Sequence, residues 1–70
     1  MKIDEAVKQA LDQGKCISRS DYADEVKMCP VSSVMPLTIM MADGSHPCKN
    51  WNPTAEDLMA EDWILVNWRF

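Results

Sequence analysis

The single histidine of the chain lies two residues from a cysteine. On a strand, His46 and Cys48 would point to the same face, because side chains alternate along an extended backbone. A thiol beside an imidazole base can act as a nucleophile when a third group orients the base. The neighbours Ser45 and Pro47 favour a histidine in a surface turn instead. A small Cys-His hydrolase is therefore the less favoured interpretation.

The three cysteines, Cys16, Cys29 and Cys48, raise the alternatives of a metal site and a disulfide. Cys29 with His46 and Cys48 lacks the paired short spacings of zinc sites, so we expect no metal. An odd number of cysteines leaves one over even if two pair. The start of the chain is acidic at Asp4–Glu5, where an export signal would need an apolar run, so we expect a reducing cytoplasm. We therefore predict three free, buried cysteines.

Four carboxylates lie close together near the carboxyl end, and paired carboxylates can perform acid–base catalysis or bind a cation. Glu56 and Asp57 fall in the first turn of a predicted short helix, where the helix dipole favours negative charge. Glu61 and Asp62 precede Trp63 at the entry of a predicted strand. A structural role is favoured for all four. We accordingly expect a protein that is not an enzyme and that needs no cofactor.

Two aromatic residues stand among polar neighbours, which suits stacking on a nucleobase. Tyr22 follows Arg19 by three residues, and Trp51 precedes Asn52 and Thr54. These polar side chains could face the phosphate or ribose oxygens of a bound nucleotide. The alternative, in which Trp51 only closes the edge of a sheet, stays open.

The charge balance is acidic, with 11 Asp and Glu against 7 Lys and Arg and a formal net charge of −4. This balance argues against nonspecific binding to nucleic acid or to an anionic membrane, which depends on dense positive charge. A small anionic ligand held by a few placed donors is not excluded.

Apolar residues recur at three- and four-residue spacing near the start of the chain and predict a helix from Asp4 to Gln13. Asp4 is the expected N-cap, and Gly14 the residue that ends the helix in the left-handed conformation. Two-residue alternation then predicts a strand over Lys15–Arg19. A second strand is expected over Val26–Cys29.

Turn residues divide the rest of the chain. Pro30 ends the second strand, and Leu37–Met41 has strand composition. Asp43-Gly44 predicts a hairpin, whose return strand would run over His46–Trp51. Thr54, followed by Asp57 three residues later, predicts a capping box at the start of a short helix.

The last predicted strand, Trp63–Trp68, carries large apolar groups on both faces. A small domain with one sheet covers only one face with its own helix, so the other face needs a partner. The sequence therefore predicts one α+β domain over residues 1–70. In it, an N-terminal helix packs on a small antiparallel sheet, a short helix precedes the last strand, and the domain self-associates.

The stretch from Trp51 to Trp63 resembles the closing motif of the Thoeris anti-defence type-two family of small phage and prophage proteins. In that family a tryptophan, a proline–serine/threonine step, an aspartate–leucine pair and an alanine–glutamate–aspartate–tryptophan run close the domain. The matching residues here are Trp51, Pro53-Thr54, Asp57-Leu58 and Ala60-Glu61-Asp62-Trp63. Earlier segments are also similar: Glu5-Ala6, Leu11, Gly14-Lys15, Arg19, the aromatic Tyr22, and Ala42-Asp43-Gly44. Tyr22 stands where the family commonly has tryptophan, and the segment from Asp24 to Pro36 is shorter than usual.

The resemblance implies a sponge. Members of the family bind cyclic ADP-ribose signals of bacterial defence without destroying them, some take up cyclic oligonucleotides, and they assemble as homotetramers with the ligand between subunits. The implied partner of this chain is a cyclic ADP-ribose-type molecule in the host bacterial cytoplasm. The expected ligand-binding residues are Arg19, Tyr22, Trp51, Asn52, Thr54 and Asp57, although the cap could commit Asp57 to holding the loop. A phage module that binds a host protein is the alternative.

Overall fold

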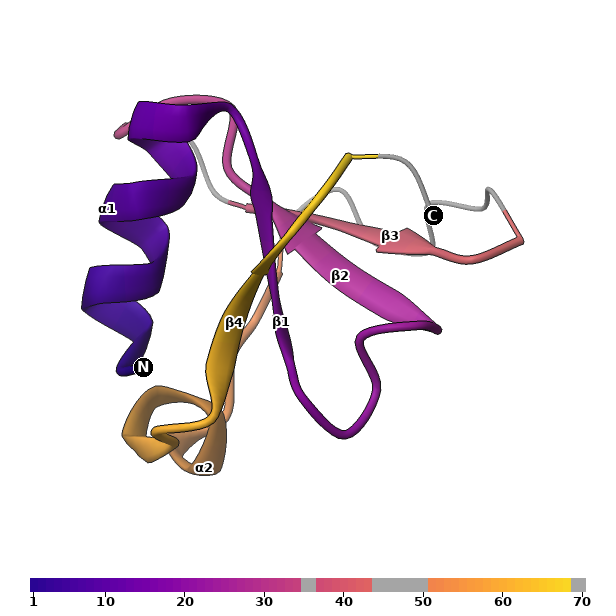
Figure 1. The fold of residues 1–70 in the computed structure, drawn as a ribbon. Helices are drawn as coiled ribbons and strands as arrows, with labels where there is room; N and C mark the ends of the chain where they lie inside the picture. The colour runs from indigo at the N-terminus through magenta and orange to yellow at the C-terminus, as the bar shows by residue number, and fades with distance from the viewer. Residues whose placement is uncertain (35–36, 44–50, 69–70) are drawn as a thin grey trace.

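The structure is a computed structural model that describes residues 1–34, 37–43 and 51–68. Within these ranges, two helices and four strands follow one another (Figure 1): α1 (Ile3–Gln13), β1 (Cys16–Arg19), β2 (Val26–Cys29), β3 (Thr38–Met41), α2 (Ala55–Met59) and β4 (Trp63–Val66). This arrangement confirms the predicted α+β class, with α1 against an antiparallel sheet and a short helix before the last strand.

Helix α1 begins one residue earlier than predicted. Its N-cap is Lys2, which makes no side-chain capping bond, so the prediction of Asp4 as N-cap is wrong. Asp4 and Glu5 lie inside the first turn, where their charges still favour the helix dipole. Gly14 ends the helix as predicted, with φ 66° and ψ 39° in the left-handed region that glycine adopts without steric cost.

The sheet has the strand order β3-β2-β1-β4, and every neighbouring pair is antiparallel. The outer ladders are regular: β1 pairs with β4 from Cys16 opposite Val66 to Arg19 opposite Trp63. Likewise, β2 pairs with β3 from Val26 opposite Met41 to Cys29 opposite Thr38. The sheet is thus made of two well-paired halves.

The central junction between β1 and β2 has a single backbone pair, Ile17 opposite Met28. Pro30 has no N–H to extend the ladder beyond Cys29. At the other end, the Val26 N–H donates to the Tyr22 carbonyl, and the Val26 carbonyl accepts a 2.7 Å bond from the Ser18 hydroxyl. We call this junction, with its single pair of residues, the central seam.

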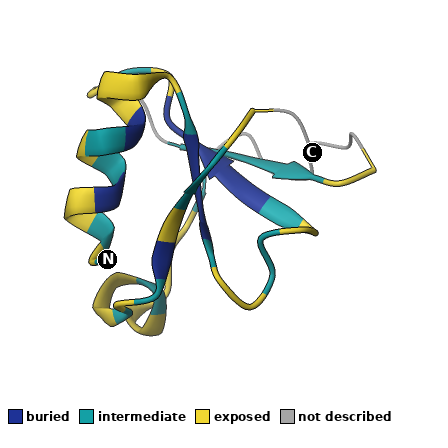
Figure 2. Cartoon of the chain, viewed as in Figure 1, coloured by how far each residue is buried: buried dark blue, intermediate teal, exposed yellow. Residues whose placement is uncertain are grey.

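The core lies between α1 and one face of the sheet, as the buried colouring in Figure 2 shows. Its buried members are small on the helix and large on the sheet: Ala6, Ala10, Ile17, Met28 and Trp63. The two alanines allow α1 to approach the strands closely. On the last strand, Trp63 is fully buried and Leu65 on the same face is partly buried, whereas Ile64 on the other face is 37% exposed.

Cys16 and Cys29 form a disulfide across the central seam, so the prediction of free thiols is wrong for these two residues. Their burial is confirmed, because both are fully buried. The pairing follows from the register: with Ile17 opposite Met28, Cys16 lies directly opposite Cys29, and their Cα atoms are 4.4 Å apart. Antiparallel neighbours at this spacing can be bridged without moving the backbone. Cys48 lies outside the described residues.

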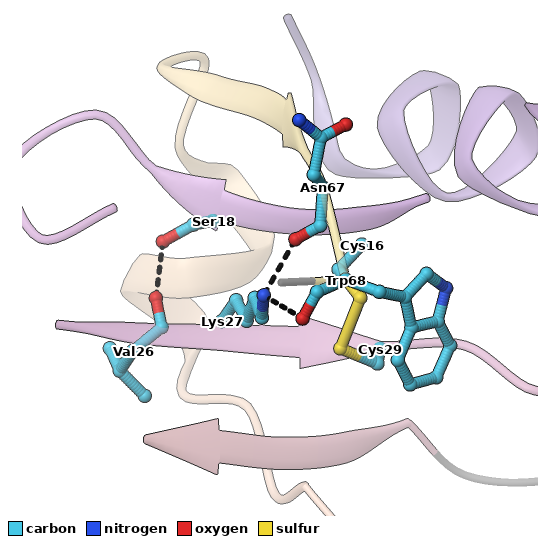
Figure 3. The surroundings of a disulfide bond; sticks show 7 residues. All are labelled: Cys16, Ser18, Val26, Lys27, Cys29, Asn67 and Trp68. Atoms are coloured by element: carbon cyan, nitrogen blue, oxygen red, sulfur yellow. Dashed lines mark hydrogen bonds between the residues drawn. A yellow bond between two sulfur atoms is a disulfide. The ribbon is translucent and has the colours of Figure 1, made fainter. Parts of the chain in front are cut away.

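Lys27 is buried on the same face of β2 as Cys29. Its ammonium donates hydrogen bonds to the main-chain carbonyls of Asn67 and Trp68, just after β4 (Figure 3). Burial lowers the pKa of this amine, and the two carbonyls stabilise its charge. The side chain therefore joins β2 to the carboxyl end of β4 across the intervening strand β1.

Several strand boundaries differ from prediction, and one predicted strand cannot be compared with the structure. β1 and β3 begin at Cys16 and Thr38, each one residue later than predicted. Strand β4 ends at Val66 rather than Trp68. Of the predicted hairpin, Ala42 and Asp43 form a turn, while residues 44–50, which hold most of the predicted return strand, lie outside the described ranges. Among the described residues, no helix combines the length and apolar character needed to cross a membrane.

Candidate functional site

A hollow of about 490 Å³ opens between α1, α2 and the residue that precedes β3. Its lining is mostly apolar, with one carboxylate: Ile3, Asp4, Val7, Leu37, Trp51, Pro53 and Leu58. The i, i+4 spacing of Ile3 and Val7 places both side chains on one side of α1. Segments from both ends of the chain therefore build one concave surface.

Trp51 is the only aromatic residue among those that line the hollow. Its main-chain N–H donates to the Leu37 carbonyl at 2.8 Å. Its half-buried ring meets the buried Trp63 ring edge to face, with centroids 5.6 Å apart and planes at 71°. Trp51 therefore packs on the sheet residue Trp63 and also presents surface to the hollow, while stacking on a nucleobase stays a prediction.

The capping box predicted at the start of α2 is confirmed. The Asp57 N–H donates to Thr54 Oγ1 at 3.2 Å, and the Thr54 N–H donates to Asp57 Oδ2 at 3.0 Å. The Thr54 hydroxyl oxygen and one Asp57 oxygen therefore act as acceptors within the cap. Asn52, which follows Trp51 in the chain, is exposed and is not among the residues that line the hollow.

Arg19 joins three elements through two carboxylates. Its Nε lies 2.5 Å from Asp62 Oδ1, before β4, and its Nη1 lies 3.4 Å from Asp57 Oδ1 on α2. The guanidinium carbon also lies 6.0 Å from the Trp63 ring centroid, within cation–π range. We call Arg19, Asp57 and Asp62 the ion-pair brace.

The brace shifts the proton affinities of its members. The hydrogen bond to Asp62 is the main cause that raises the pKa of Arg19. Desolvation alone would raise the pKa of Asp62, but the hydrogen bond and charge of Arg19 lower it below its usual value. Both groups therefore stay charged at neutral pH.

The brace also fixes the tryptophan pair indirectly. The Trp63 indole N–H donates to the Asp57 carbonyl at 2.9 Å. Asp57 thus contacts Arg19 through its carboxylate and Trp63 through its main chain. Because Trp51 packs on Trp63, the position of the hollow's aromatic wall depends on this chain of contacts.

Tyr22 is half-buried and packs against the core cluster, so it is less exposed than the sequence suggested. Burial is the main cause that raises the pKa of its phenol, and the nearby charge of Asp57 adds to the rise. Tyr22 lies beside the ion-pair brace and is not among the residues that line the hollow.

A family model described as the Thoeris anti-defense 2-like (Tad2-like) domain matches residues 1–66. The chain belongs to this family. The resemblance noted in the sequence is thereby confirmed, and the function class is Thoeris anti-defence, which suggests interaction with a small-molecule signal. The match is to an anti-defence domain and not to a catalytic family. No curated protein and no solved structure matches the chain.

The Tad2-like domain gathers its predicted site residues in two neighbouring places. Trp51 lines the hollow, with Asn52 next to it in the chain, and Thr54 and Asp57 form the cap that follows. Arg19 and Tyr22 lie at the ion-pair brace behind Trp63. Sequence reasoning missed the apolar wall of Ile3, Val7, Leu37 and Leu58, since apolar periodicity indicates a buried face without telling core from pocket.

The sequence raised a metal site and a cysteine nucleophile as alternatives, and the described part of the domain bears on only the first of them. Among the described residues, no group of three His, Cys, Asp or Glu side chains could hold a metal ion. His46 and Cys48, the candidates for thiol catalysis, lie outside the described residues. The absence of catalysis stays a prediction.

Proposed function

We propose that this Tad2-like domain captures a cyclic ADP-ribose-type signal in the hollow beside Trp51 and holds it without chemical change. Captured ligand is withheld from the defence effector that the signal would activate. The observation that carries the proposal is the hollow itself, whose apolar lining includes an aromatic ring. Cyclic oligonucleotides are the alternative ligands.

The size and lining of the hollow suit the base of a nucleotide. Small-molecule sites commonly measure about 300–1,000 Å³ and combine apolar walls with a few polar groups. The Trp51 ring offers a surface for stacking, and the Asp4 carboxylate could accept a hydrogen bond from an exocyclic amine or a ribose hydroxyl. A carboxylate in the wall disfavours phosphate there, so the base or a ribose is the better occupant.

The pyrophosphate needs donors from elsewhere. The guanidinium of Arg19 is shared by two carboxylates, and the Thr54 hydroxyl acts as an acceptor in the cap, so its O–H is the one donor left on that side chain. The Asn52 amide is the exposed polar side chain next to Trp51. We propose that a second subunit supplies further donors, with the ligand held between copies of a homotetramer.

The six predicted site residues then have different roles. Trp51 and Asn52 contact ligand, with Trp51 stacking on the base. Arg19, Thr54 and Asp57 position the wall through the ion-pair brace and the cap. Tyr22 contacts ligand with its hydroxyl end or supports Arg19, since its ring is half-buried.

A capture-and-release assay tests the proposal. Purified protein is incubated with cyclic ADP-ribose isomers, or with cyclic di- and trinucleotides in parallel, and passed through a filter that retains protein. The retained protein is then denatured, and the ligand is assayed by mass. Ligand that disappears from the filtrate and returns intact supports a sponge; altered ligand would establish a hydrolase instead.

Trp51→Ala is expected to weaken capture by about fivefold or more, since stacking on one base contributes about 1–3 kcal/mol. Trp51→Phe keeps a stacking ring and is the matched control, for which we expect a smaller loss. If Trp51→Ala captures ligand as well as the parent, the hollow is not the site.

A second candidate, binding to a host protein, is favoured by the exposed apolar residues Leu58 and Met59, which are 53% and 75% exposed on α2. This candidate takes first place if no nucleotide is captured and Leu58→Asp abolishes binding to an isolated partner.

A further inference from the structure

The central seam is held by side chains more than by backbone. One residue pair joins β1 to β2, whereas the ladders on either side have four pairs each. Side-chain ties make up the difference: the Cys16–Cys29 disulfide, the bond from the Ser18 hydroxyl to the Val26 carbonyl, and the bonds from Lys27 to the carbonyls after β4. Of these, only the disulfide can be made or broken by electron transfer.

The hollow spans the two halves that the seam joins. Helix α1 packs on β1 and β4, and it also contacts α2. The residues of both helices that line the hollow therefore belong to the β1–β4 half. Leu37 immediately precedes β3 and belongs to the β2–β3 half. Trp51 bridges the halves, because its N–H binds the Leu37 carbonyl while its ring packs on Trp63 of β4. If the seam separates, the two walls of the hollow are no longer held at a fixed distance from each other.

We propose that the Cys16–Cys29 disulfide is a redox-controlled latch that keeps the hollow assembled, so that the oxidised protein holds its ligand and the reduced protein releases it faster. The latch itself stands on the geometry of the seam. Its effect on ligand rests on the proposed function.

The chemistry is thiol–disulfide exchange with a small thiol. A thiolate attacks one protein sulfur, the S–S bond breaks, and the other protein sulfur leaves as a thiolate that takes up a proton. A second thiol resolves the mixed disulfide, so that two protein thiols and one small disulfide result, with two electrons transferred. Because Cys16 and Cys29 are fully buried, the attack requires local opening, and each redox state should persist for longer than an exposed disulfide would.

The test uses the full chain with Cys48→Ser, which removes the third cysteine and leaves the latch pair intact. Oxidised and fully reduced forms are compared by amide hydrogen exchange. The amides of Met28, Ile17 and Trp51 report the seam and the hollow, and the amide of Ile64, opposite Ser18 in the β1–β4 ladder, is the internal reference. Cys16→Ser/Cys29→Ser serves as a permanently open variant, and the chemically reduced form replaces it if that variant does not fold.

We expect reduction to speed exchange at Met28 and Trp51 at least tenfold relative to Ile64. Equal relative protection in both forms would overturn the latch, whether or not ligand binds. With cyclic ADP-ribose as the probe, we expect dissociation to be at least tenfold faster from the reduced form, and equal dissociation rates would overturn the control of ligand. If neither form captures the probe, the proposed function fails, and a loss of Trp51 protection on reduction would still establish the latch.

Discussion

At the scale of single residues, most polar groups near the candidate site are bound to one another. Arg19 is shared between Asp57 and Asp62, and Ser20 Oγ also lies 3.4 Å from Asp62 Oδ2. The site therefore presents mainly apolar surface and uses its charges for structure. This separation explains how an acidic domain can still present a wall suited to a nucleobase.

The ion-pair brace gives stability a defined pH dependence. The folded pKa of Asp62 is lowered relative to its unfolded value of about 3.9. Its contribution to folding is therefore fully present above the unfolded pKa and is lost as the pH falls through the folded pKa. We expect thermal stability to fall below about pH 4 more steeply for the parent than for Asp62→Asn, which has no proton to gain at this position. Parallel melting curves of the two proteins across this range would contradict the assignment.

At the scale of elements, the capping box of α2 stabilises a very short helix and also helps to position Trp63. The helix spans five residues, too few for helix propensity alone to hold it. The capping box fixes its first turn, and the Asp57 carbonyl then receives the Trp63 indole N–H. The short helix thereby sets one side of the tryptophan pair.

Thr54→Ala should destabilise the domain by about 1 kcal/mol, because it removes the side-chain half of the capping box. Thr54→Ser keeps the hydroxyl and is the control, for which we expect a loss near zero. Denaturant unfolding measures both. A Thr54→Ala variant as stable as the parent would show that α2 does not need the cap.

The end of α1 offers a second element-scale test. Gly14 adopts φ 66°, and no heavy atom lies within 4 Å of the position that a Cβ would take. Gly14→Ala should therefore cost only the backbone strain of a left-handed residue, about 1–2 kcal/mol, without a clash. Gln13→Ala, at the exposed last helical position, is the matched control. Equal unfolding midpoints for the two variants would contradict this reading of the helix end.

At the scale of the whole molecule, the face of β4 that carries Ile64 is the surface on which the predicted self-association can be tested. This strand lies at an edge of the sheet, and Ile64 and Trp68 at and beyond it are 37% and 40% exposed. An edge strand with exposed apolar side chains is a common site of self-association.

Ile64→Asp should reduce the oligomer to smaller species in analytical ultracentrifugation, because it places a charge in the proposed interface. Val31→Asp, at another exposed apolar position, should leave the mass unchanged. If Ile64→Asp keeps the parent's mass, β4 is not the interface. If the parent is itself a monomer, the proposal of a ligand held between subunits fails.

Much of this molecule was predictable from local patterns. The apolar spacing of α1, its stop at Gly14, the strands around Ile17 and Met28, and the Thr54–Asp57 box all depend on residues close in sequence. The disulfide, the Lys27 bonds and the ion-pair brace join residues that are distant along the chain. Their formation depends on strand order and register, which local periodicity does not determine, so the sequence suggested free cysteines and an Arg19 available to ligand.

The pairing of β1 with β4 also sets the timing of biogenesis. β1 lies early in the chain and β4 close to the last described residues, and the Trp63 N–H further donates to the Met1 carbonyl. During translation, the nascent helix and the first three strands are therefore exposed before β4, the strand that completes their sheet, has been synthesised. The domain can reach its native state only after Val66 has left the ribosome, so a premature stop before β4 would yield a chain that lacks Trp63 in its core and leaves β1 without its edge partner.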